Sequence, residues 1–430
     1  MPAFWSLLRD NPNYRYAWVG QVVSEVGDHF NTIAVLSLAL NVTGSGLAVG
    51  GVMIARTLPA ILAGPLAGIV LDRMDRRNVM IASDLMRAVV ALGFILILTR
   101  GQEWLMYVLS GLLMFASPFF TSGRSAILPR ITRSHEELHT ANAMTQTTAW
   151  LTLSIGTMLG GVSAMQFGYG WAFAFNSASF LFSAWAISLM RPEGGNFRPE
   201  RSDLHVRRTG WADLGDSLRY IRATPLVLAI GLAGIGWSSG GGAAQILFTL
   251  FGEVVFQKGP AGVGLIWGSA GIGLVIGGIA GHRIGQRLSF AAYKHTISVC
   301  FSVLGGAYIL FSLSQSIWVA VIFITLSRIA MGANNVLNRT MLLTHVPDAY
   351  RGRVYSTVDM MMHTVMMLSM MGAGVASKYW SVRTIGVVAG ALSASTAVFW
   401  TWANLAGKLT EPLQSVPEEE EDLESPVHPA

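Results

Sequence analysis

The chain has 430 residues, of which 52% are hydrophobic and only 12% are charged. A water-soluble globular protein carries about twice this charged fraction. A chain with this much apolar surface requires lipid as its surrounding solvent. The net charge of +5 therefore does not indicate a nucleic-acid partner, because membrane topology is expected to place these charges. The single cysteine, Cys300, excludes a disulfide framework and a CxxC metal site.

Twelve apolar segments are each long enough to cross a bilayer as a helix of about 20 residues. They lie at about residues 15–41, 46–71, 77–98, 103–127, 138–165, 170–190, 225–252, 261–281, 290–313, 316–342, 351–377 and 381–406. A longer polar linker, 191–224, separates an N-terminal six-helix bundle, 1–190, from a C-terminal six-helix bundle, 225–406. The tail, 407–430, ends in an acidic run that predicts disorder. We therefore expect an all-α membrane protein of twelve transmembrane helices in two halves.

Basic residues are concentrated in every second connection between these segments. The basic connections are 72–77, 130–133, the linker, 282–287 and 351–353. Three of the alternate connections carry no basic residue, and the other three hold only Arg100, Lys258, and Lys378 with Arg383. Because basic loops remain on the cytoplasmic side, we expect both termini and the linker in the cytoplasm and the protein in the cell (inner) membrane.

The two halves repeat a pattern at the end of their second segment. The first half has Gly68-x-x-x-Asp72-Arg73-x-x-Arg76-Arg77, and the second has Gly278-x-x-x-His282-Arg283 with a later basic residue. Two parallel halves of six segments are the organisation of major facilitator transporters. The repeat therefore predicts two structurally related halves.

The first of these runs resembles the signature of the major facilitator superfamily between spans 2 and 3. Other motifs resemble its twelve-span drug:proton antiporter branch, which includes macrolide and enterobactin exporters. These motifs are Gly20-Gln21, Gly27-Asp28, Thr43-Gly44-Ser45, Gly123-Arg124-Ser125-Ala126-x-Leu128-Pro129, Ala141-Asn142-Ala143 and Arg351-Gly352-Arg353-Val354. Two positions depart from the pattern: Asp75 stands where the signature has glycine, and Thr157 where the antiporter motif has proline.

The resemblance implies a secondary transporter that exports a small amphipathic solute, drug-like or siderophore-like, by alternating access around a site near the midplane. No GxxxxGK[ST] nucleotide-binding loop occurs, so proton influx is the expected energy source and no cofactor is expected. The expected partners are a small-molecule substrate, protons and the lipid bilayer, with no nucleic acid and a monomeric chain.

The signature run is expected to control gating. Asp72 would lie at the cytoplasmic end of span 2, and by the resemblance near the start of span 11 at Gly352. A carboxylate at a helix N-terminus contributes about 0.3–1 kcal/mol. Alternatively, Asp72 and its arginines only anchor a cytoplasmic loop. The gating set comprises Gly68, Asp72, Arg73, Arg76, Arg77, Gly240, Gly241, Gly278 and Arg283.

Glycines are unusually dense in spans 7 and 8. In span 7 they predict a bend or a non-helical break over 236–243, facing the cavity, because glycine is a poor helix former. The alternative is a straight helix that uses small residues for packing. In span 8, glycines at 273, 277, 281 and 285 form a stripe that predicts close approach of another helix.

Span 1 carries the richest set of polar residues within a span. Gln21, Ser24, Glu25, Asp28, Asn31 and Thr32 recur at helical spacing and lie on one face. Ionisable groups inside a membrane are costly and usually functional, so we expect Asp28, helped by Glu25, to couple transport to protons. Arg56 in span 2 differs in depth from Asp28 by only about 6 Å and is the predicted countercharge. Alternatively, these charges form a permanent pair that never titrates.

The C-terminal half provides a second polar set. Arg328, Asn335 and Asn338 fall in span 10, and Asp359 and His363 are four residues apart in span 11, so their side chains are expected to stack. The predicted substrate cavity comprises Gln21, Asn31, Thr32, Gln245, Arg328, Asn335, Asn338, Asp359 and His363. Alternatively, these groups are buried hydrogen-bonding partners that hold helices together.

Other functions are alternative interpretations of the same sequence. A facilitator or importer of a small polar solute or a metal ion is one alternative, the latter because span 11 combines seven methionines with His363. A membrane zinc metalloprotease is a remote one, because His135-Glu136-Glu137-Leu138-His139 matches HExxH, although no third ligand follows at metzincin spacing. No metal site is expected.

Overall fold

The computed structural model describes residues 2–100, 102–191, 197–198 and 211–411. These residues form helices and no strand. The helices are α1 (Pro2–Asp10), α2 (Pro12–Thr43), α3 (Gly46–Leu71), α4 (Arg76–Gly93), α5 (Ile95–Arg100), α6 (Trp104–Ile131), α7 (His135–Phe167), α8 (Tyr169–Ser188), α9 (Trp211–Ala223), α10 (Pro225–Leu250), the π-helix η2 (Phe251–Val255), α11 (Gly259–Gly285), α12 (Phe290–Leu313), α13 (Ile317–His345), α14 (Asp348–Ala376) and α15 (Val382–Leu405).

The predicted all-α membrane fold is confirmed. Ten helices of the described part are long and apolar enough to cross a membrane. Helices α2 and α8 do not meet that criterion, but they pack against each other and against spanning helices. Each of the twelve predicted segments thus coincides with a helix. Part of the linker forms α9, whereas the rest of it and the tail from residue 412 lie outside the described residues.

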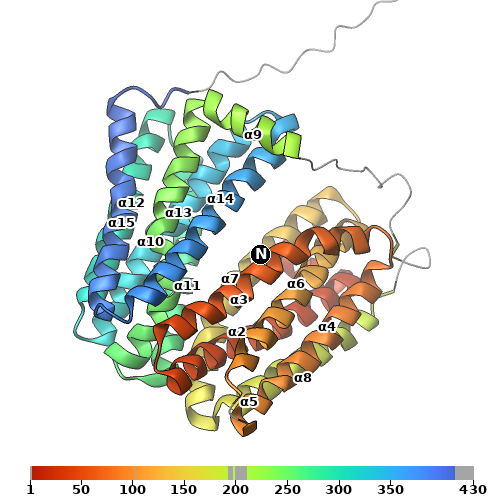
Figure 1. Ribbon diagram of the computed structural model, residues 1–430. Coiled ribbons are helices and arrows are strands. Elements are labelled where there is room, and N and C mark those ends of the chain that lie inside the picture. The colour runs from red at the N-terminus through yellow and green to blue at the C-terminus, as the bar shows by residue number, and fades with distance from the viewer. Residues whose placement is uncertain (1, 101, 192–196, 199–210, 412–430) are drawn as a thin grey trace, which may run out of the picture.

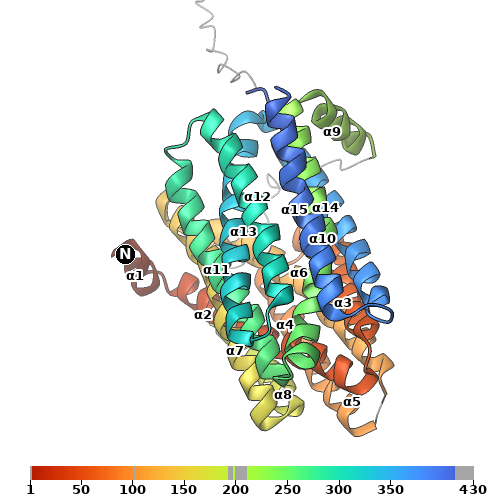
Figure 2. The ribbon, with the colours of Figure 1, turned by 90° about the vertical axis from the view of Figure 1, so that its left-hand side faces the viewer.

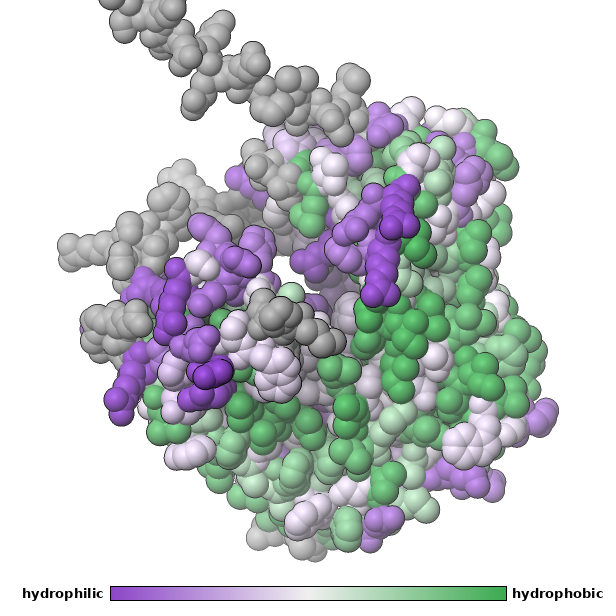
Figure 3. Space-filling view, turned by 180° about the vertical axis from the view of Figure 1, so that it is seen from behind, coloured by the Kyte–Doolittle hydropathy of each residue, from purple (hydrophilic) through white to green (hydrophobic). Residues whose placement is uncertain are grey.

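The helices form two bundles that separate toward one end of the molecule (Figure 1). Helices α1–α8 make the N-terminal half and α9–α15 the C-terminal half, and the side view shows α10 to α15 running together from end to end (Figure 2). We call the end that holds α9 and the loops after α3, α6, α11 and α13 the basic end. In Figure 3, apolar residues cover the body of the molecule and polar residues surround a hollow.

Helix α11 contacts both halves through glycine. A Cβ atom at Gly277 would overlap the carbonyl oxygen of Ile329 in α13, so the predicted close approach is confirmed. On another face of α11, a Cβ atom at Gly264 would overlap the carbonyl oxygen of Thr157 in α7. Because α7 belongs to the N-terminal half, α11 joins the two bundles while remaining packed in its own.

The predicted break over 236–243 is wrong. Helix α10 continues through Gly240 and Gly241 to Leu250, and the irregular turn is instead the π-helix that follows it. A Cβ atom at Gly240 would overlap the carbonyl oxygen of Ala389 in α15, and one at Gly242 that of Met366 in α14. These glycines permit contact between helix backbones, and this packing outweighs their low helix propensity.

The close contact of α11 with α13 predicts that Gly277→Leu destabilises the folded protein. A leucine forces the two backbones apart, and overpacking of this kind costs about 1–3 kcal/mol. Thermal unfolding and folded yield after size-exclusion chromatography measure the effect. Gly306→Leu is the matched control, because a Cβ atom there meets nothing within 4 Å. Equal stability of the two variants would contradict the contact.

Candidate functional site

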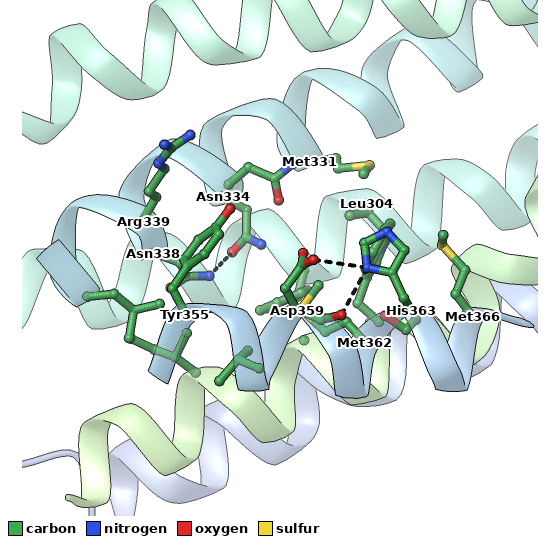
Figure 4. Close-up of a pocket in the computed structure, with 18 of the residues that line it drawn as sticks. Leu304, Met331, Asn334, Asn338, Arg339, Tyr355, Asp359, Met362, His363 and Met366 are labelled. Atoms are coloured by element: carbon green, nitrogen blue, oxygen red, sulfur yellow. Dashed lines mark hydrogen bonds and ion pairs between the residues drawn. The ribbon is translucent and has the colours of Figure 1, made fainter. Parts of the chain in front are cut away.

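A cavity of about 360 Å³ lies between the halves, lined chiefly by α10, α12, α13 and α14 of the C-terminal half. Trp150 of α7 completes the wall from the N-terminal half. The lining residues lie in the second half of α13, in the middle of α14 and in the first half of α10, so the cavity extends from the middle of the bundle toward the basic end. Its lining combines aromatic rings, methionines and a small set of polar side chains (Figure 4).

Asp359 and His363 form a carboxylate–imidazole pair in this cavity. The Nδ1 atom of His363 lies 3.3 Å from Oδ2 of Asp359 and 2.9 Å from the Asp359 carbonyl oxygen. Their side chains are 50% and 40% exposed, so both are accessible from the cavity. The predicted stacking of these residues is confirmed, because a four-residue spacing places them on one helical face.

A row of asparagines on α13 faces this pair across the cavity. Asn338 donates from Nδ2 to Oδ1 of Asn334 at 3.0 Å and accepts at its own Oδ1 from the Tyr293 hydroxyl at 2.7 Å. These bonds fix the orientation of the Asn338 amide. Asn335 also lines the cavity and is exposed. The structure therefore brings together Asn335, Asn338, Asp359 and His363.

The other predicted cavity residues lie elsewhere. Arg328 is buried behind the cavity wall, with its guanidinium carbon 5.2 Å from the ring centre of Phe248. Gln245 lies in α10 beyond the cavity-lining segment of that helix. Gln21, Asn31 and Thr32 belong to a polar network inside the N-terminal half. These residues therefore do not line this cavity in the described conformation, because spacing along a helix does not give the helix's rotation in the bundle.

The N-terminal network has Glu25 of α2 at one of its centres. The carboxylate accepts a hydrogen bond from Gln21 at 2.7 Å and another from the Thr152 hydroxyl of α7 at 2.8 Å. Nη1 of Arg124 in α6 lies 3.4 Å from Oε1 of Glu25. Glu25 therefore holds together three helices of the N-terminal half.

Asp28 is the second centre, one turn further along α2. Its Oδ2 lies 3.7 Å from Nη1 of Arg87 in α4, while Nη2 of Arg87 makes a short ion pair with Asp84 of the same helix. The Arg87 guanidinium lies between the rings of Phe120 and Phe180, at 4.7 and 4.3 Å from their centres. One buried arginine thus serves two carboxylates, and Asp28 holds the more distant position.

Arg56, the predicted countercharge of Asp28 or Glu25, makes no direct ion pair with either carboxylate, although its charge still acts on Asp28. Arg56 instead donates to Oδ1 of Asn31 at 3.3 Å and to the Thr32 hydroxyl at 2.9 Å. That hydroxyl donates in turn to the carbonyl oxygen of Asp28 at 2.7 Å. Helical rise correctly placed Arg56 near this depth, but the rotation of α3 directs it to the next turn of α2.

Sequence reasoning did not assign Asp84, Arg87 or Arg124 to this network. Asp84 and Arg87 were detectable as ionisable residues three apart within an apolar segment, the same signal that singled out Asp28. Arg124 was noted only as part of a motif. Which helices adjoin α2 decides these pairings, and helical periodicity does not contain that information.

The signature segment forms an ordered turn at the basic end. Asp75 has φ −62°, so this turn needs no glycine, and its side chain caps α4 by accepting from the Asn78 N–H at 3.2 Å. Arg76 donates to the Ala126 carbonyl oxygen at 3.0 Å and Arg77 to that of Met190 at 2.8 Å. These arginines tie the turn to α6 and to the end of α8.

The remaining gating residues make few contacts in this conformation. Asp72 and Arg73 are exposed, and a Cβ atom at Gly68 would meet nothing within 4 Å. In α11, Arg283 is exposed, whereas a Cβ atom at Gly278 would lie 2.6 Å from the ring of Trp150. A latch between Asp72 and the start of α14 stays a prediction for a conformation in which the basic end is closed.

The HExxH segment begins α7, where Ser134 caps the helix by accepting from the Glu137 N–H at 3.1 Å. Within the described ranges, no group of three or more histidine, cysteine, aspartate or glutamate side chains could hold a metal ion. The zinc-protease reading therefore gains no support from the described geometry.

Solved structures share this fold. The nucleoside transporter NupG superposes with a TM-score of 0.71 at 11% identity, over 90% of this chain and 99% of that chain. At this identity the match establishes the fold alone.

Several curated relatives are named as exporters or efflux pumps. The chain is 24% identical to the putative bacilysin exporter BacE of Bacillus subtilis (strain 168), with 81% of this chain and 84% of that protein covered. It is 25% identical to the multidrug efflux pump Tap of Mycolicibacterium fortuitum, with 81% of this chain and 85% of that protein covered. It is 24% identical to the enterobactin exporter EntS of Escherichia coli O1:K1 / APEC, with 81% of each chain covered.

The family match extends over nearly the whole chain. Residues 3–428 match the family described as transmembrane secretion effector. The match includes both six-helix halves, and it agrees with the predicted resemblance to major facilitator exporters. We conclude that the chain belongs to the transmembrane secretion effector family and is a membrane transporter of the major facilitator superfamily.

Proposed function

We propose that this transporter exports a small amphipathic solute by alternating access, with the solute bound in the cavity between the halves. The observation that carries this proposal is the cavity itself, which combines Trp150, Trp237 and Tyr355 with the Asp359–His363 pair. Aromatic walls with a few oriented polar groups suit a ligand that has both an apolar body and polar substituents. Relatives named as exporters support the outward direction.

The basic loops support the orientation. With the positive residues in the cytoplasm, the basic end faces inward and the described conformation opens to the cytoplasm, as loading of an export substrate requires. We place both termini in the cytoplasm and the protein in the inner membrane, acting as a monomer. Closure of the basic end would then bring Asp72 toward the start of α14. The corresponding segment of the second half, with Gly278 and Arg283, would contribute to the same closure.

Proton coupling is the proposed role of Asp28 and Glu25. When Asp28 is ionised, Arg87 is shared between it and Asp84. Protonation of Asp28 removes one charge, so Arg87 pairs with Asp84 alone and the contact between α2 and α4 weakens. Protonation of Glu25 likewise weakens its ion pair with Arg124, which links α2 to α6. Arg56 supports Asp28 through Thr32 rather than by direct pairing.

An efflux panel tests transport and its direction together. Expression in a host that lacks its own pumps should lower the accumulation of amphipathic dyes and drugs, and Asp359→Asn should reduce this effect because the cavity loses its carboxylate. Asp216→Asn is the control, since Asp216 is half-exposed on α9 and pairs only with its neighbour Arg219 among the described residues. Increased accumulation on expression would instead favour the importer or facilitator function.

Asp28→Asn should abolish export driven by a pH gradient, because asparagine imitates the protonated carboxylate and cannot release a proton. Protein level and solute binding should remain near wild type, because Oδ2 of Asp28 lies as far as 3.7 Å from Nη1 of Arg87, its nearest charged partner. Arg87→Ala should instead lower stability by about 3–5 kcal/mol, because it leaves buried Asp84 without its partner. Transport into proteoliposomes with an imposed pH gradient measures the first effect. Full gradient-driven transport by Asp28→Asn would contradict this coupling role.

A further inference from the structure

Arg328 is a buried cation whose surroundings offer it no carboxylate. It lies on α13 with 7% of its surface exposed, and no ion pair joins it to an acidic residue in the part of the chain that the structure describes. Its Nη1 donates to the sulfur of Met331 at 3.2 Å. Its guanidinium carbon lies 5.2 Å from the ring centre of Phe248 and 5.9 Å from that of Tyr308. A thioether is a weak acceptor, so the cation is poorly satisfied.

Two further polar groups beside Phe248 lack an acceptor among the described residues. The Tyr308 hydroxyl and the indole N–H of Trp267 are buried and form no hydrogen bond there. Both rings adjoin Phe248, with centre-to-centre distances of 6.4 Å for Tyr308 and 5.1 Å for Trp267. Four helices, α10 to α13, thus bring one guanidinium and two neutral donors to the same region. This environment is electropositive.

Arg56, in the other half, is an arginine within a span whose hydrogen-bond donors do have oxygen acceptors. Its guanidinium has two oxygen acceptors, on Asn31 and Thr32. Arg87 and Arg124 each have a carboxylate partner. A cation within a span that has only aromatic faces and a thioether is costly, and such residues commonly face a ligand pathway. Stacking on Phe248 and Tyr308 offsets part of this cost.

The cation lies directly behind the cavity wall. Met331, which accepts its hydrogen bond, lines the cavity together with Phe301 and Leu304 of α12. Arg328 and Met331 are three residues apart on α13, so they lie on the same face of that helix. Arg328 is the nearer of the two to the start of α13, away from the basic end, and therefore lies behind the deep end of the cavity. Methionine side chains are flexible, so rotation of one thioether would open a path from the cavity to the guanidinium.

We propose that the deep end of this cavity is a subsite for a carboxylate or similar singly charged anionic group of the transported solute, bound by Arg328 once Met331 moves aside. The subsite deepens the proposed export function and rests on it. The Asp359–His363 pair lies nearer the basic end, so a solute with an acidic group at one end and a donor-bearing polar group at the other would contact both.

A matched pair of probes tests the subsite in purified full-length protein. 1-Naphthaleneacetate and the neutral 1-naphthaleneacetamide share one apolar ring system and differ in a single charge. In a low-salt Tris–HEPES buffer free of chloride and of carboxylate anions, wild type should bind the acid at least about tenfold more tightly than the amide, as a charge-assisted pair provides. Arg328→Gln should lower acid binding to the level of the amide and leave amide binding unchanged. Lys378→Gln, which removes an exposed positive charge from a loop, should change neither.

Met331→Ala gives an independent readout that does not depend on the folding of Arg328→Gln. Removing the covering thioether should strengthen acid binding without strengthening amide binding, and Arg328→Lys should retain a preference for the acid. Equal binding of acid and amide by wild type would overturn the subsite, as would unchanged acid binding in a folded Arg328→Gln variant. Where only Met331→Ala folds, unchanged acid affinity in that variant overturns it.

A chloride titration separates a solute subsite from a resident inorganic anion. Competition of chloride with naphthaleneacetate, lost in Arg328→Gln, supports one shared anion site that the solute reaches. Chloride binding that depends on Arg328 while acid binding does not would overturn the proposal. Failure of the export function is distinguishable: Arg328-dependent acid binding without export in the efflux panel refutes export alone, whereas export with no Arg328-dependent acid preference refutes the subsite alone.

Discussion

The structure depends most on the cost of holding charge in a membrane. Water cannot compensate an ionised side chain there, so each such group needs a partner from a neighbouring helix. In the N-terminal half this requirement joins α2 to α4 through Asp28 and Arg87, and α2 to α6 through Glu25 and Arg124. Helix α2 is therefore joined by ion pairs to two neighbouring helices, and these pairs are the proposed site of proton coupling.

The two halves use polar residues differently. The N-terminal half pairs its carboxylates with arginines, whereas the C-terminal half exposes Asp359 and His363 to a cavity. Trp150 is the N-terminal contribution to that cavity, and it packs on Gly278 of α11. A change in the position of α7 relative to α11 would therefore reach the cavity wall directly. This contact joins the half that holds the ion pairs to the wall of the proposed binding cavity in the other half.

Glycine makes the connection between the halves possible. Helix α11 approaches α13 at Gly277 and α7 at Gly264 so closely that no Cβ atom would fit at either position. Contacts between backbones have few interlocking side chains, so they hold two helices together while presenting a smooth surface between them. Helix α10 uses Gly240 and Gly242 in the same way against α15 and α14, and for this reason it remains continuous where its composition predicted a break.

The sequence by itself determined those features that depend on local spacing or on the solvent. Apolar length gave the spanning helices, a four-residue step gave the stacking of Asp359 with His363, and a glycine stripe gave the close approach to α11. The tertiary structure alone decided the partners: Arg87 makes the direct ion pair with Asp28, Arg56 bonds Asn31, and Arg328 lies behind the cavity wall. Periodicity specifies which residues share a face of one helix. The order and rotation of the helices in the bundle specify what that face meets, because packing between distant segments sets them.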